Sequence, residues 1–164
     1  MKPASVATLA VAAILGTFPA LAKSPPGQAF ITKAVQGNLA EVQMGRLAQE
    51  KGHSDETKAF GQRLVTDHSH ANERASAVAS GIGVTPPTEP TAKQRADHDR
   101  LAKLSGASFD RAFAAHMVAD HEKDVREYRA EAKKKDAAAA YAAETLPVLE
   151  QHLQMAQGLA KAKH

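Results

Sequence analysis

The stretch of sequence that decides the fold is residues 54–81, SDETKAFGQRLVTDHSHANERASAVASG. It begins with Ser54, Asp55 and Glu56, a combination typical of helix starts, and it ends on Gly81, a common helix stop. Between these ends, residues recur at steps of three and four along one helix face: Phe60, Leu64, His68, Ala71, Ala75 and Val78. The stretch therefore predicts a long amphipathic helix, which has to bury that face against other helices.

Three more segments show the same period and predict long helices at 28–51, about 108–134 and 137–161. Residues 81–90 hold three prolines and two glycines and predict a non-helical connection, and residues 91–104 predict a short polar helix after it. Four long amphipathic helices indicate an all-α protein, a four-helix bundle with a long crossover between its second and third long helices. The spacing leaves open whether that crossover returns along the bundle.

Composition excludes several classes of function. The chain has 164 residues, 43% of them hydrophobic and 24% charged, which fits one globular domain and argues against disorder. It has no cysteine, which excludes disulfides, thiolate zinc sites and thiol nucleophiles. The 21 basic residues only slightly outnumber the 18 acidic ones, and no basic run is long enough to wrap nucleic acid. Phosphate-binding loops and serine-hydrolase motifs are absent from the sequence.

The first 22 residues predict an export signal. Lys2 provides a positive start, residues 7–18 are apolar, and the stretch ends in Pro-Ala-Leu-Ala at residues 19–22, where a signal peptidase would cleave after Ala22. The apolar run is shorter than the roughly 20 residues needed to span a bilayer. We therefore expect cleavage, a single domain over residues 23–164 without a transmembrane segment, and a periplasmic location.

One short pattern occurs twice. Residues 59–68 are AFGQRLVTDH and residues 112–121 are AFAAHMVADH, so six of ten positions agree when Leu and Met are taken as equivalent. Limited helix composition produces such repeats by chance, but core packing alone would not select the Asp-His pair that ends each copy. The repeat indicates a duplicated or pseudo-symmetric site.

Four ionisable side chains lie on inward stripes of the predicted helices: His68, His121, His152 and Glu41. His121 and His152 lie roughly 21 and 24 Å from the turn that joins their helices, at 1.5 Å per residue. Glu41 and His68 differ in depth by roughly 6 Å around their own turn, which a glutamate can bridge. The four side chains are thus expected to converge near the middle of the bundle. Asp124, one turn after His121, is a further ligand or an acceptor that orients the imidazole.

Three imidazoles and a carboxylate at one level predict a site for a transition metal ion, and iron, zinc and copper all suit this donor set. The competing interpretation is that each histidine hydrogen-bonds to a nearby acid or to a backbone carbonyl, with Asp67, Asp120 and Asp124 available as acids. Surface positions are expected for the other histidines, which are His53, His70, His98, His116 and His164.

The sequence also resembles a known family through five ordered motifs. They are Gly37-Asn38-Leu39-Ala40-Glu41-Val42, Val65-x-Asp67-His68-x-x-Ala71-Asn72, Leu104-Ser105-Gly106-x-x-Phe109-Asp110, Val118-x-Asp120-His121-x-x-Asp124 and Leu146-Pro147-x-Leu149-x-x-His152. These are similar to the bacterial domain of unknown function 4142 family. The resemblance implies an exported protein with a ferritin-like four-helix bundle. Its members are often labelled predicted outer membrane proteins.

Two functions from different classes follow. The first is a periplasmic ferritin-like protein that binds a transition metal through Glu41, His68, His121 and His152, for metal handling or protection against redox stress. The second is a metal-free helical envelope or stress protein that acts through protein contacts. An oxidase would need an open coordination position on a bound metal. Di-iron ferritins use a Glu-x-x-His pair on each of two helices, and the predicted core stripes carry none, which argues against ferroxidase chemistry.

Overall fold

The computed structural model describes residues 24–162, and within them the chain is all-helical, with five helices and no strand. The helices are α1 Gln28–Lys51, α2 Asp55–Gly81, α3 Ala92–Ala102, α4 Gly106–Glu131 and α5 Ala139–Lys161. The all-α expectation is confirmed for this part of the chain, with the short extra helix present as α3. The predicted export signal at residues 1–22 lies outside the described residues.

Local side-chain hydrogen bonds set several helix starts. The Ser54 hydroxyl accepts a hydrogen bond from the backbone N–H of Thr57, which caps α2. Thr91 accepts from the Gln94 N–H while the Gln94 side chain accepts from the Thr91 N–H, a complete capping box. This box explains why α3 begins directly after the proline-rich connection that ends at Pro90.

The turn between the last two helices is longer than predicted. Helix α4 ends at Glu131 rather than near residue 134, and α5 begins at Ala139 rather than at 137. The Asp136 carboxylate accepts a hydrogen bond from the Ala138 N–H, and the Lys134 ammonium donates to Glu131. Such local side-chain bonds compete with helical ones, so the lysine-rich stretch forms a turn instead of a last helical turn.

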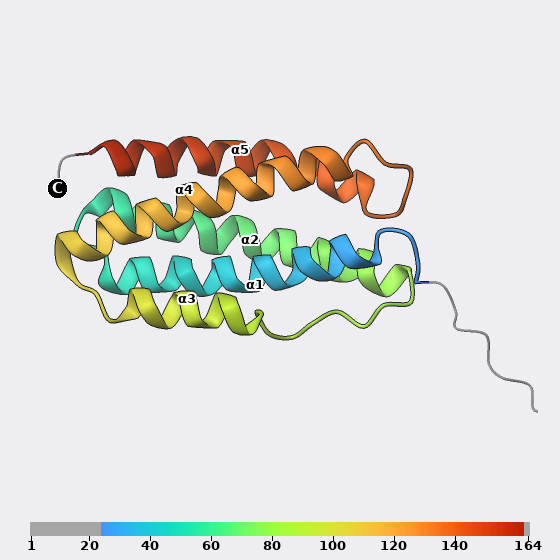
Figure 1. Cartoon of the computed structure of the whole chain (residues 1–164), viewed down its shortest axis with the longest axis horizontal. Helices are drawn as coiled ribbons and strands as arrows, with labels where there is room; N and C mark the ends of the chain where they lie inside the picture. The colour runs from blue at the N-terminus through green and yellow to red at the C-terminus, as the bar shows by residue number, and fades with distance from the viewer. Residues whose placement is uncertain (1–23, 163–164) are drawn as a thin grey trace, which may run out of the picture.

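The four long helices lie side by side, and α3 lies along the outside (Figure 1). Helix α1 packs mainly on α2, and α4 packs mainly on α5. The chain leaves α2 at one end and returns through the connection and α3 to the other end before α4 begins (Figure 1). Helix α4 therefore runs parallel to α2, which settles the direction that the sequence left open. Leu101 is the buried residue of α3 and attaches this helix to the core.

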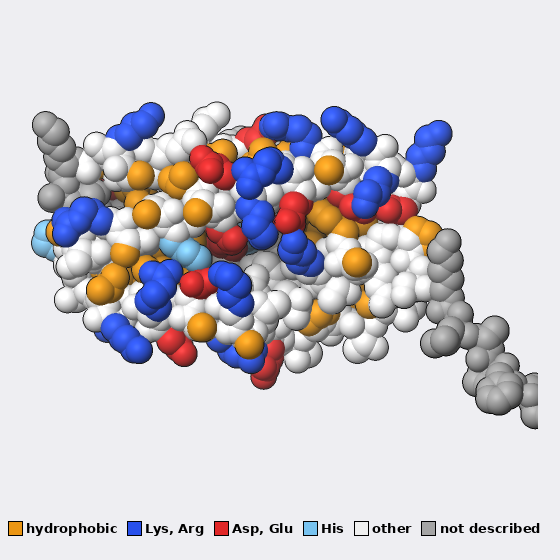
Figure 2. Space-filling view, in the orientation of Figure 1, with side chains coloured by type: hydrophobic (Ala, Val, Ile, Leu, Met, Phe, Trp, Pro, Cys, Tyr) orange, Lys and Arg blue, Asp and Glu red, His pale blue; other side chains and the backbone are white. Residues whose placement is uncertain are grey.

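Two apolar clusters fill the interior. One contains Phe60, Leu64 and Phe113 together with residues of α1 and α5, and the other contains Ile31 and Tyr141. Around them, acidic and basic side chains are interleaved over the face that Figure 2 shows. No helix among residues 24–162 is long and apolar enough to cross a membrane.

Helices α1 and α2 approach closely where two glycines face each other. A Cβ atom added to Gly45 would lie 2.5 Å from the carbonyl oxygen of Gly61, and one added to Gly61 would lie 2.6 Å from the carbonyl oxygen of Gly45. Both distances are well below van der Waals contact, so any side chain at either position would force the two backbones apart.

Candidate metal centre

Three histidines meet in the interior, one from each of three helices. His68 of α2, His121 of α4 and His152 of α5 are 4%, 2% and 0% exposed. One ring nitrogen of each lies within 4.8 Å of the corresponding nitrogens of the other two. Phe60 of the first apolar cluster contacts the His121 and His152 rings at centroid distances of 6.4 and 5.9 Å. We call these three residues the histidine cluster.

Each ring of the histidine cluster is held by a hydrogen-bond acceptor on its outer side. His68 Nδ1 donates to Asn38 Oδ1 at 2.9 Å, and His121 Nδ1 donates to the Met117 carbonyl oxygen at 3.0 Å. His152 Nε2 donates to Asp67 Oδ2 at 2.9 Å. Because all three partners accept at these atoms, each outer nitrogen carries the proton and each inner nitrogen is left with a lone pair.

The inner nitrogens face one another without partners. His68 Nε2, His121 Nε2 and His152 Nδ1 are buried and make no hydrogen bond within the described part of the chain. Leaving a buried acceptor unsatisfied costs about 1–3 kcal/mol, and here three acceptors point toward a common centre. The arrangement is unfavourable as long as these three nitrogens have no further partner.

Burial keeps the three rings neutral. Burial, followed by repulsion from His121 and His152, lowers the pKa of His68 well below its usual value. Burial, followed by repulsion from His152, lowers the pKa of His121 from 6.5 to about 4. Burial also lowers the pKa of His152, against the raising effect of the Asp67 carboxylate. The neutral imidazole is the protonation state that metal binding requires.

Comparison with known proteins places the chain in a family. Residues 16–159 match the sequence model of a family described as Domain of unknown function (DUF4142). The chain belongs to the DUF4142 family. This confirms the resemblance carried by the five motifs. Searches of curated proteins and of solved structures found no match.

In this DUF4142 chain, the five predicted ligands separate into two groups. The three histidines come together, but Glu41 and Asp124 do not belong to the group of ligand atoms that they form. Glu41 is buried on α1, where burial, followed by the charges of Asp120 and Asp124 of α4, raises its pKa well above its usual value. The carboxylates expected to complete the histidine site thus gather beside it, between α1 and α4.

The two aspartates of the repeated Asp-His pattern do not pair with the histidines that follow them in the sequence. Asp67 precedes His68 in the sequence but accepts from His152 on another helix. Asp120, its counterpart in the repeated pattern, contacts Glu41 and Lys123 instead. The repeat therefore marks two cluster residues correctly, but its two aspartates have different roles.

Asn38 is a site residue that sequence reasoning missed. It is 2% exposed, and its side-chain NH₂ donates to the Tyr141 hydroxyl at 2.9 Å while its oxygen accepts from His68. The Tyr141 hydroxyl lies 3.5 Å from that of Tyr128. A row of polar groups thus runs from His68 into the second apolar cluster. Its sequence signal is an asparagine on the same small-residue stripe as Glu41.

The lowered pKa of His121 predicts how pH affects the metal-free protein. Unfolded His121 takes up a proton as pH falls below about 6.5, whereas folded His121 resists until about 4. Its contribution therefore lowers stability as pH falls through this window. The raised pKa values of the buried Glu41 and Asp124 act in the opposite direction over the same window. The variant His121→Gln keeps Glu41 and Asp124, so comparing it with wild type isolates the contribution of His121.

We expect the free energy of unfolding of metal-free wild type to fall relative to that of His121→Gln between pH 7 and pH 4.5, by about 2–3 kcal/mol. Urea unfolding at the two pH values, in the presence of a chelator, measures the difference. Equal changes in both proteins would mean that His121 titrates normally.

Proposed function

We propose that the protein binds one transition metal ion through His68, His121 and His152. The observation that carries this proposal is the set of three buried inner nitrogens, each an unprotonated acceptor and each without a partner among residues 24–162. The hydrogen bonds of the outer nitrogens fix the rings but leave the inner nitrogens unsatisfied. A metal ion satisfies all three nitrogens at once.

Three neutral imidazoles suit zinc, copper and iron, and three protein ligands leave a further coordination position for water or a small molecule. Metal–nitrogen bonds of about 2.1 Å in a tetrahedral site place the nitrogens about 3.4 Å apart. The rings would therefore move slightly inward on binding, within the 4.8 Å that now contains their nitrogens. The Asp67 carboxylate behind His152 would strengthen that ligand, as carboxylates behind metal-bound histidines commonly do.

The proposal includes the fold and the cellular role. We propose a ferritin-like four-helix bundle, supported by the single long crossover through α3 that makes α2 and α4 parallel. We also propose that the signal predicted at residues 1–22 directs the protein to the periplasm. There, a buried nitrogen site would serve metal handling or protection against redox stress.

Equilibrium dialysis of the metal-free protein against Zn²⁺, Cu²⁺ and Fe²⁺ tests the proposal. We expect about one equivalent of at least one metal to be retained, and a chelator that outcompetes the site to remove it. Less than about a tenth of an equivalent of each metal would contradict a metal site. The second function, a metal-free protein acting through protein contacts, would then be the better explanation.

A further inference from the structure

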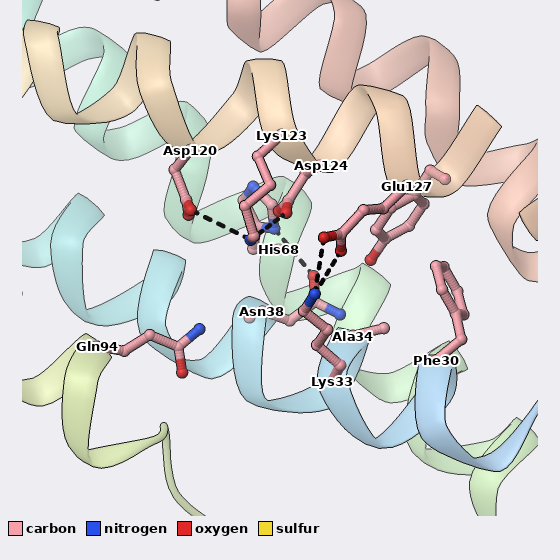
Figure 3. A pocket seen from close by; sticks show the side chains of 12 residues that line it. Phe30, Lys33, Ala34, Asn38, His68, Gln94, Asp120, Lys123, Asp124 and Glu127 are labelled. Atoms are coloured by element: carbon pink, nitrogen blue, oxygen red, sulfur yellow. Dashed lines mark hydrogen bonds and ion pairs between the residues drawn. The ribbon is translucent and has the colours of Figure 1, made fainter. Parts of the chain in front are cut away.

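The buried histidine cluster needs a path by which an ion arrives. A small cavity of about 30 Å³ lies between α1 and α4 and is lined by His68 and its partner Asn38. Figure 3 shows this cavity, with His68 behind a row of charged side chains from α4. This α1–α4 cavity connects a member of the cluster to the surface charges.

Ion pairs occupy the outer part of the α1–α4 cavity. Lys33 donates to both carboxylate oxygens of Glu127 at 2.7 Å. Lys123 lies 3.1 Å from Asp124 and 3.6 Å from Asp120, as the dashed lines in Figure 3 mark. Lys33 is exposed, whereas Asp120, Asp124 and Glu127 are partly buried, and Lys123 is a cation held between two carboxylates.

Glu41 brings a third carboxyl group to the edge of this cavity, without forming a close ligand group with Asp120 and Asp124. It lines an adjoining groove of about 250 Å³ together with Asp120 and Lys123. Its side chain is 3% exposed, and Oε2 has no hydrogen-bond partner in the described residues. Burial, followed by the charges of Asp120 and Asp124, raises the pKa of Glu41 well above its usual value. Glu41 also hydrogen-bonds to Asp120, so Oε2 is the atom of this buried carboxyl group that is left without a partner. A cation beside it would offset the repulsion among the three carboxylates.

We propose that Glu41, Asp120 and Asp124 form a loading site, which holds a hydrated divalent cation before it passes to His68. The inference rests on the proposed function and adds a second, oxygen-donor position to it. Carboxylates bind hydrated divalent ions readily and release them to nitrogen ligands that bind first-row transition metals more tightly. When no ion is present, the Lys123 ammonium group lies beside these carboxylates and balances their charge. An arriving divalent ion displaces it.

A second surface pocket provides the competing route. It lies between α2 and α5, has a volume of about 130 Å³, and is lined by Asp67, Arg74 and Glu144. Arg74 lies 3.5 Å from Glu144 and 5.5 Å from the ring centre of Tyr141. The guanidinium here accompanies two carboxylates. The α1–α4 side has more carboxylates than ammonium groups by a wider margin, so a cation is expected to prefer it.

Stopped-flow mixing of metal-free protein with Co²⁺ tests the loading site, because nitrogen-bound Co²⁺ absorbs visible light. We expect the double variant Asp120→Asn, Asp124→Asn to bind the same final amount of Co²⁺ about tenfold more slowly than wild type. Lys123→Met should bind it roughly threefold faster, because the competing positive charge is gone. Glu144→Gln is the matched control on the other route and should load at the wild-type rate.

The outcomes separate the two proposals. Wild type that takes up no Co²⁺ at equilibrium would contradict the proposed metal site itself. Full Co²⁺ uptake with unchanged rates in the Asp120→Asn, Asp124→Asn and Lys123→Met proteins would leave the metal site intact and overturn the loading site. Slower loading of Glu144→Gln would also overturn it, because ions would then enter between α2 and α5. Circular dichroism checks that each variant is folded.

Discussion

If the proposed metal site exists, replacing His121 with alanine is expected to lower its affinity for the metal ion by more than about 100-fold. Loss of a group behind a ligand typically costs 10–100-fold, and loss of one of only three ligands exceeds that. The variant keeps the imidazoles of His68 and His152. Each is fixed on its own helix, so neither can take the place of the nitrogen lost from α4. Competition with a coloured chelator of known affinity measures the change.

The same substitution is expected to abolish stabilisation by metal. A ligand at 100 times its dissociation constant adds about 2.7 kcal/mol, which raises the melting temperature of a domain of this size by about 10 °C. His70→Ala, at an exposed position on α2, is the matched control and should keep the full rise. An equal rise in His121→Ala and wild type would mean that the ion binds elsewhere.

Replacing Gly61 with alanine should destabilise the protein by about 3 kcal/mol, the upper part of the range for an overpacked interior. The added Cβ would lie 2.6 Å from the Gly45 carbonyl oxygen and 2.8 Å from the Ala48 Cβ. Backbone atoms cannot rotate away as a flexible side chain can, so α1 and α2 must separate. Urea unfolding of metal-free protein at neutral pH measures the loss.

Gly37→Ala is the control for this prediction. Gly37 lies inside α1, and a Cβ added there meets no atom within 4 Å. Because alanine favours helix over glycine, this variant is expected to gain about 0.5–1 kcal/mol of stability. Equal effects at Gly37 and Gly61 would show that helix propensity, rather than the contact between the helices, governs both positions.

Much of the fold follows from periodicity, but the path of the chain does not. Apolar spacing and end signals predict α1 and α2 closely, because Gly52 ends α1 and the Ser54 hydroxyl caps the start of α2. The glycine in the left-handed conformation after α2 is Gly83 rather than Gly81. The direction of the crossover depends on where α3 packs. That helix is polar and is attached through Leu101, so its position is decided by contacts distant in sequence.

The candidate site, like the fold, could be predicted only in part. Stripe positions bring the three histidines inward because each helix has one buried face. The pattern of apolar residues shows which side chains point into the bundle, but not which of them come together at one site. Glu41 contacts Asp120 of α4 rather than the imidazoles. Distances along a helix cannot resolve this, since a rotation of one residue moves a side chain by about 100° around the axis.

The row of polar groups from His68 through Asn38 to the tyrosines has an optical consequence. The chain has no tryptophan and two tyrosines, so Tyr128 and Tyr141 dominate its near-ultraviolet absorption and its intrinsic fluorescence. Both are buried, and Tyr141 is linked to the His68 ring by hydrogen bonds through the Asn38 side chain. The protein therefore contains a built-in chromophore pair beside the histidine cluster, which reports on changes there without an attached label.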